Sequence, residues 1–152
     1  MSAIVVGIGN LSRGDDAVGP LVAARVARLG LPDVEVVVHD EPLALLEHLA
    51  THEDVVVVDA ATVRRGRPGT VHVVQVGSTP LPIDSPASGS HGLGVAEAIE
   101  LARALCRLPK RLTLVGVEGE VFAVGAPLTE RVRACLDDAV RAVVGTLPAS
   151  AC

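Results

Sequence analysis

Two carboxylates and one histidine stand where predicted strands end or helices begin, and together they could bind a metal ion. Asp15 and Asp16 follow the first predicted strand, Asp59 ends the third, and His91 precedes a predicted helix. In an open parallel sheet, ligands bind beyond the carboxyl ends of strands and beside helix N-termini. Two carboxylates and an imidazole suit a borderline divalent ion such as nickel or zinc. These residues are therefore candidate ligands, although no local motif such as HExxH joins them.

Each of these residues also has a structural explanation. One of Asp15 and Asp16 is expected to cap the following helix by accepting its free N–H groups. Asp59 follows four valines and must be solvated or hydrogen-bonded, so structural and functional roles are both open. A histidine before a helix is commonly a surface residue. No partner can be identified for the other histidines, which we expect at the surface: His39, His48, His52 and His72.

A glycine-rich loop, GIGNLSRG at 7–14, raises nucleotide binding as an alternative. It departs from the Rossmann fingerprint because Ser12 stands where a third glycine is required, and only Asp40 follows the second strand as an acid. Gly7 and Gly9 more simply permit a tight turn and the close approach of a partner backbone. There is no GxSxG elbow and no cysteine beside a histidine, so covalent catalysis has no candidate nucleophile.

The composition argues against nucleic acid and membranes as partners. With one Phe and no Trp or Tyr, the chain lacks the aromatic faces on which bases stack, and its net charge of -5 offers no basic footprint. The apolar runs are too short to span a bilayer, and the N-terminus has no signal-peptide pattern. Cys106 and Cys135 lie in helical patterns as small apolar residues. A reduced, cytoplasmic protein fits these features.

Short apolar runs alternate with helical patterns, which predicts an α/β fold with a mostly parallel sheet in a single domain, residues 1–152. Strands are expected at 3–8, 34–39, 55–59, 70–76 and 112–117, and helices at 16–29, 43–51, 93–108 and 129–144. Only about ten residues separate Asp59 from Thr70, too few for the crossover that a parallel neighbour needs. We therefore expect the fourth strand to be antiparallel at a sheet edge.

Four segments resemble the hydrogenase maturation endopeptidases. GIGNLSRGDDAVGP at 7–20 is similar to the N-terminal signature of that family, and VVVVDA at 55–60 to its second signature. SHGLGVAEAIELA at 90–102 is similar to its histidine signature, and LTLVGVE at 112–118 to its last strand. The resemblance runs from the first strand to the final helix.

This resemblance implies a three-layer fold, with a twisted five-stranded sheet and helices on both faces. It implies an endopeptidase that removes the C-terminal extension of a nickel-iron hydrogenase large-subunit precursor once nickel has been inserted. The family's nickel-sensing residues correspond to Asp16, Asp59 and His91, and the nickel is carried by the substrate. Asp40 is retained, but Glu41-Pro42 replaces the family's glycines. Glu118 stands where the family often has Glu or Gln, and it is expected to line the cleft.

Two questions of mechanism stay open at the level of sequence. Nickel could polarise the scissile carbonyl or activate a bound water, or Asp16 or Asp40 could act as general base.

The main alternative function is a non-enzymatic nickel-binding maturation chaperone that uses the same ligands. The small size and the absence of an obvious exposed apolar helix lead us to expect a monomer.

Overall fold

The computed structural model describes residues 3–62, 66–77 and 94–148. Its five strands form one sheet in the order β2-β1-β3-β5-β4. The strands are β1 (Ala3–Ile8), β2 (Val34–His39), β3 (Asp54–Ala61), β4 (Val71–Gln75) and β5 (Arg111–Glu118). All neighbours are parallel except β4, which runs antiparallel to β5 at the sheet edge. The predicted fold class and the antiparallel edge strand are confirmed.

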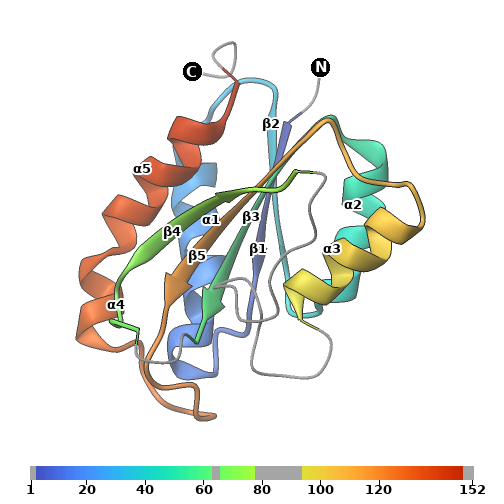
Figure 1. Ribbon diagram of the computed structural model, residues 1–152. Coiled ribbons are helices and arrows are strands. Elements are labelled where there is room, and N and C mark those ends of the chain that lie inside the picture. The colour runs from blue at the N-terminus through green and yellow to red at the C-terminus, as the bar shows by residue number, and fades with distance from the viewer. Residues whose placement is uncertain (1–2, 63–65, 78–93, 149–152) are drawn as a thin grey trace.

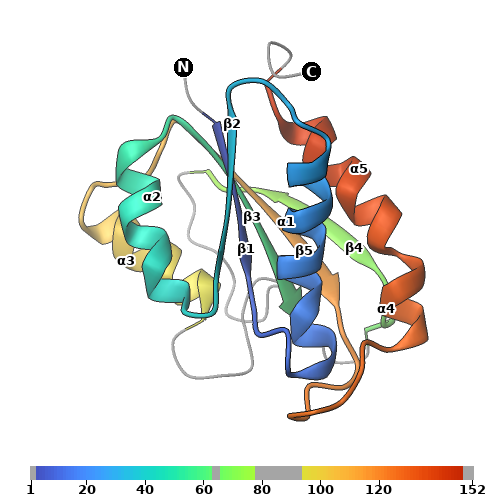
Figure 2. The ribbon, with the colours of Figure 1, turned by 180° about the vertical axis from the view of Figure 1, so that it is seen from behind.

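Continuous apolar runs form the central strands because helices cover both faces of the sheet. Every residue of β1 and β3 is buried. The helical segments are η1 (Gly14–Ala17), α1 (Val18–Arg28), η2 (Pro42–Ala44), α2 (Leu45–Thr51), α3 (Val95–Ala104), α4 (Glu130–Ala134) and α5 (Leu136–Thr146). Figures 1 and 2 show α1, α4 and α5 on one face of the sheet and α2 and α3 on the other. None of the helices in the described part of the chain has the length and apolar character needed to cross a membrane.

All four predicted helices differ from the observed ones at an end or by an internal break. The helix expected at 93–108 is shorter, since α3 spans Val95–Ala104. The helix expected at 16–29 and the helix expected at 43–51 each begin with a separate 3-10 turn. The helix expected at 129–144 is divided at Cys135, whose φ of -96° and ψ of 1° interrupt the α conformation. Apolar periodicity continues through such interruptions, so it predicts the buried face correctly and the backbone break poorly.

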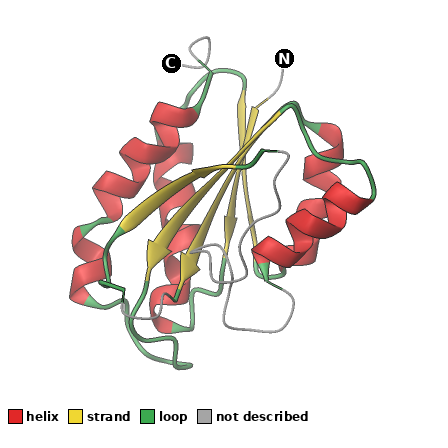
Figure 3. Cartoon of the chain, viewed as in Figure 1, coloured by secondary structure: helices red, strands yellow, loops and turns green. Residues whose placement is uncertain are grey.

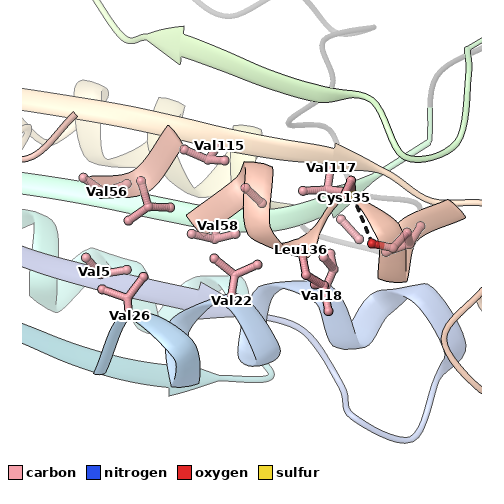
Figure 4. Packing of buried hydrophobic residues seen from close by; sticks show 14 of the residues in the cluster. Val5, Val18, Val22, Val26, Val56, Val58, Val115, Val117, Cys135 and Leu136 are labelled. Carbon is pink, nitrogen blue, oxygen red and sulfur yellow. Dashed lines mark hydrogen bonds between the residues drawn. The ribbon is translucent and has the colours of Figure 1, made fainter. Parts of the chain in front are cut away.

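Two apolar cores lie on the opposite faces of the sheet. One lies beneath α1 and α5, where Val22 and Val26 pack with valines of β1, β3 and β5 (Figure 4). The other lies beneath α2 and α3, where Leu45 and Ile99 pack against the alternate residues of the same strands. Successive side chains of a strand point to opposite faces. The buried side chains along each central strand therefore alternate between the two cores.

The two described cysteines have different environments. Cys135 is buried in the core beneath α1 and α5, and burial raises the pKa of its thiol, so it is an apolar residue as predicted. The prediction that Cys106 lies within a helix is wrong. It follows the end of α3 with a φ of 56°, and its side chain is exposed. Cys152 lies outside the described residues.

Glycines bring the N-terminal part of α1 directly onto the sheet. A Cβ at Gly19 would lie 2.6 Å from the carbonyl oxygen of Val58 and even closer to that of Ile8. At Gly9, which has a φ of 151°, a Cβ would collide with the carbonyl oxygen of Asp16. Gly7 similarly faces the backbone of Gly19. The predicted close approach is therefore made by the chain's own helical segment, whereas a partner backbone was expected.

Replacing Gly19 with alanine should test this contact. The added methyl group must displace the backbone of β1 or β3, so we expect the free energy of unfolding to fall by about 1–3 kcal/mol. Gly145→Ala is the matched control, because Gly145 lies in α5 with no atom near its Cβ position. That variant should be stabilised by about 0.5–1 kcal/mol. Urea denaturation measures both changes, and equal effects of the two substitutions would contradict the close contact at Gly19.

Candidate functional site

Asp16 and Asp59 lie close enough at the carboxyl edge of the sheet for their charges to interact. Figure 3 shows this edge, where the arrowheads of the parallel strands end. Asp59 lies near the end of β3, opposite Gly116 of β5, and is only 8% exposed. Asp16 lies in η1, the turn that leads from β1 into α1. Its Oδ2 accepts a hydrogen bond of 2.9 Å from the backbone N–H of Asn10. The loop between β1 and α1 thus holds the Asp16 carboxylate.

Electrostatics couple these two carboxyl groups. Burial raises the pKa of Asp59 well above its usual value, and the nearby charge of Asp16 raises it further, while a hydrogen bond from the backbone of Ala60 acts in the opposite direction. Two carboxyl groups in such proximity cannot both ionise without cost. A positive charge placed between the two groups would remove that cost.

Asp15 has a different role from its neighbour. It is fully buried, and its carboxylate accepts hydrogen bonds from the backbone N–H groups of Glu120, Val121 and Thr129, at 2.7–3.1 Å. The Thr129 hydroxyl donates to the same carboxylate. Asp15 therefore fixes the segment that joins β5 to α4. The capping prediction is wrong for both aspartates, because neither side chain caps the helical turn in which it lies.

The other two predicted site residues are His91 and Asp40. His91 lies outside the described residues, so its convergence with Asp16 and Asp59 stays a prediction. The helix that follows His91 in the chain is α3, and α3 packs on the face of β3 that also carries Asp59. Asp40 follows β2 at the same edge of the sheet and is exposed. Among residues 3–62, 66–77 and 94–148, no three His, Cys, Asp or Glu side chains are grouped to hold a metal.

Sequence reasoning missed the partners of four histidines. His39 and His48 face each other with 2.9 Å between their Nε2 atoms, and His52 lies 3.6 Å from Glu35. Nε2 of His72 in β4 lies 2.5 Å from Oε1 of Glu118 in β5, within hydrogen-bond distance. The sequence predicted an antiparallel fourth strand at a sheet edge but not its neighbour, and the contact between His72 and Glu118 depends on the pairing and register of β4 with β5.

Comparisons with a family model and with a known protein both point to the hydrogenase maturation proteases. The model of the hydrogenase maturation protease family matches residues 33–146. The hydrogenase 2 maturation protease of Escherichia coli strain K12 is 31% identical over 150 residues, which are 97% of this chain and 91% of that protein. The similarity therefore covers almost the whole length of both sequences.

Two solved structures share the fold. An endopeptidase from Escherichia coli superposes with a TM-score of 0.81 at 28% identity, with 97% of this chain and 92% of that chain covered. The hydrogenase maturating endopeptidase HybD from E. coli superposes with a TM-score of 0.75 at 25% identity, with coverage of 95% and 91%.

The two adjacent aspartates should respond differently to substitution. Asp15→Asn replaces a buried carboxylate, which accepts several hydrogen bonds, with an amide whose NH2 group would face backbone N–H donors. We therefore expect the free energy of unfolding to fall by about 2–3 kcal/mol. Asp16→Asn keeps an oxygen for the N–H of Asn10 and should change it by less than about 1 kcal/mol. Chemical denaturation measures the free energy of unfolding of both variants. A larger decrease in Asp16→Asn than in Asp15→Asn would contradict the roles assigned to the two residues.

Asp59→Asn should stabilise the free protein in a pH-dependent way. The folded protein holds the pKa of Asp59 above its unfolded value, so it binds more protons than the unfolded chain, and its stability falls as pH rises between those two values. Asparagine has no such titration. The melting temperature of Asp59→Asn should therefore exceed that of the wild type near neutral pH, by about 2–4 °C for each kcal/mol. The difference should vanish at acid pH. A lower melting temperature of Asp59→Asn than of the wild type at neutral pH would contradict a buried Asp59 with a raised pKa.

Proposed function

The chain belongs to the hydrogenase maturation protease family, and we propose that this endopeptidase removes the C-terminal extension of a nickel-iron hydrogenase large-subunit precursor after nickel insertion. The observation that carries the proposal is the electrostatically coupled pair of Asp16 and Asp59 at the carboxyl edge of the sheet. The pair offers hard oxygen ligands for a cation where ligands bind in this kind of fold. A non-enzymatic nickel chaperone is set aside because the family is one of proteases.

In this proposal, nickel arrives bound to the substrate and is recognised by three residues. Asp16 and Asp59 supply carboxylate oxygens, and His91 supplies an imidazole nitrogen, which together suit a borderline divalent ion. A precursor without nickel brings no cation to the two carboxyl groups and gives the peptide no anchor. The nickel-loaded precursor supplies that cation and is held in place. Cleavage is thereby restricted to substrate that already carries its metal.

Positioning accounts for much of the catalysis in this scheme. Holding the scissile bond beside its attacking water can supply about 7–11 kcal/mol of the barrier. The nickel can also polarise the carbonyl or activate a bound water. Asp16 and Asp40 are the carboxylates proposed from the sequence as general base. Asp40 is exposed and is followed by Glu41-Pro42, where Pro42 starts η2.

Exposed apolar side chains on the loops that follow β1 and β5 support a protein substrate. Leu11 is 65% exposed, Val124 76% and Val121 37%. They lie on two loops that are bonded to each other, since the N–H of Gly125 donates to the carbonyl of Ser12 at 2.7 Å. We assign these loops to contact with the folded part of the precursor.

Cleavage of a purified nickel-loaded precursor, followed by mass spectrometry, tests the proposed function. The wild-type protein should release the C-terminal extension, and a nickel-free precursor should stay intact. We expect a fall in the cleavage rate of more than about a hundredfold in each of Asp16→Asn, Asp59→Asn and His91→Ala. Loss of a residue that merely orients a metal ligand already costs about 10- to 100-fold, and loss of the ligand itself should cost at least as much.

Gly145→Ala serves as the activity control, because its site in α5 is on the helical surface with open space around it. Efficient cleavage of the nickel-free precursor would end the nickel-recognition proposal. Unchanged cleavage by any one of the three ligand variants would remove that residue from the site.

A further inference from the structure

A row of three residues crosses the sheet at the candidate site. Asp59 of β3 is paired with Gly116 of β5, and Gly116 is paired in turn with His72 of β4. Residues paired across strands point to the same face, so the carboxyl group and the imidazole emerge on one face. Gly116 places no side chain between them. Two strand spacings set the separation of their Cα atoms at about 10 Å.

Glu118 holds the His72 ring in place. Its Oε1 lies 2.5 Å from Nε2 of His72, and its own side chain is only 6% exposed. The backbone of Glu118 is fixed as well, because its N–H donates to the carbonyl of Thr70 and its carbonyl accepts from the N–H of Gly69. A buried carboxylate bonded to one ring nitrogen sets the tautomer and orientation of the imidazole. Nε2 therefore carries the hydrogen, and Nδ1 is left with a free lone pair.

The His72 side chain is 33% exposed, which leaves its ring open to water. It makes no second hydrogen bond within the described part of the chain. Among the described residues of β3, β4 and β5, the charged groups on the same face are Glu118 of the neighbouring β5 and, two strands away, Asp59 of β3. On this face of the sheet α3 also carries Glu100 and Arg103, which bind each other. Glu118 is thus the direct partner of His72, and the ring nitrogen away from it is available for chemistry.

We propose that His72 is the general base of peptide cleavage and that Glu118 is its positioning residue. The inference rests on the proposed function, since it concerns the water that attacks the precursor held at Asp16 and Asp59. Nδ1 of His72 takes a proton from this water as the water oxygen bonds to the scissile carbonyl carbon, and the carbonyl electron pair moves to its oxygen. When that pair returns, the C–N bond breaks with its electrons on nitrogen, which takes the proton from Nδ1. One water is consumed, and a carboxyl group and an amine are formed.

His72 is better placed for this role than the two carboxylates considered above. Asp16 already accepts a hydrogen bond at Oδ2 and is assigned to the nickel. Asp40 follows β2, which lies as many strands from β3 as β4 does, but Asp40 is exposed. Compared with Asp16 and Asp40, His72 has both a free basic nitrogen and a buried group that orients it, which is the arrangement that proton transfer requires.

The test is single-turnover cleavage of the nickel-loaded precursor across a range of pH. His72→Gln places an amide nitrogen where Nε2 lies, so it can still donate to Glu118, but it has no basic nitrogen. We expect the rate constant to fall about 10²- to 10⁴-fold. Binding of the precursor and the melting temperature should remain close to those of the wild type. With precursor in saturating amount, the wild-type rate constant should rise with pH through an acidic limb, because a general base must be unprotonated to accept a proton. This limb should be absent in His72→Gln.

Glu118→Gln tests the positioning role. It should lower the rate constant by at least about tenfold, because the carboxylate that orients the imidazole is lost, while the acidic limb persists because His72 is still present. His52→Gln is the matched control: this histidine also faces a glutamate, Glu35, at 3.6 Å. It lies next to the start of β3, at the opposite edge of the sheet. Its cleavage rate and pH profile should match the wild type.

The outcomes separate the two proposals. If the wild type cleaves and His72→Gln cleaves equally fast, or keeps the acidic limb at a reduced rate, the general-base assignment is overturned and the proposed function stands. If Asp40→Asn removes the limb while His72→Gln does not, Asp40 is the base. An equal loss in His52→Gln would show that histidine replacement acts only through the fold. If the wild type leaves the nickel-loaded precursor uncut, the proposed function fails first, and the role of His72 fails with it.

Discussion

The proximity of two carboxyl groups at a buried strand end is the constraint on which the rest of the structure depends. Asp59 is almost removed from water, and Asp16 approaches it from the turn after β1. Burial and like charge both oppose ionisation, so the free protein holds an unfavourable arrangement that a cation would relieve. In the proposed function, this pair distinguishes a substrate that carries a metal from one that does not, and that distinction is the recognition step.

The surrounding structure keeps the carboxyl groups from moving apart. Gly19 lets α1 pack directly on the backbones of β1 and β3, so the turn that contains Asp16 is fixed against the strand that contains Asp59. Asp15 bonds the same turn to the segment between β5 and α4. Apolar cores on both faces of the sheet stabilise the strands themselves. The unfavourable electrostatics at the edge are therefore offset by packing and hydrogen bonds elsewhere, as is common at functional sites.

Most of the fold could be predicted from the sequence, because buried parallel strands are continuous apolar runs and the short connection after Asp59 forbids a parallel neighbour. The breaks within the helices could not, because apolar periodicity continues through them. The sequence did not reveal which of Asp15 and Asp16 is structural, since that depends on hydrogen bonds to residues more than a hundred positions away. The His72–Glu118 pair was missed for a similar reason: it depends on strand register, which is set by the packed sheet.

Proton release on substrate binding tests the central claim most directly. If Asp59 is largely protonated in the free protein and becomes a ligand of the substrate's nickel, it must lose its proton when the complex forms. A pH indicator in a stopped-flow experiment, read before cleavage begins, should then report release of about one proton per complex from the wild type at mildly acidic pH. Asp59→Asn should release none. Equal proton release from the wild type and Asp59→Asn would contradict the account.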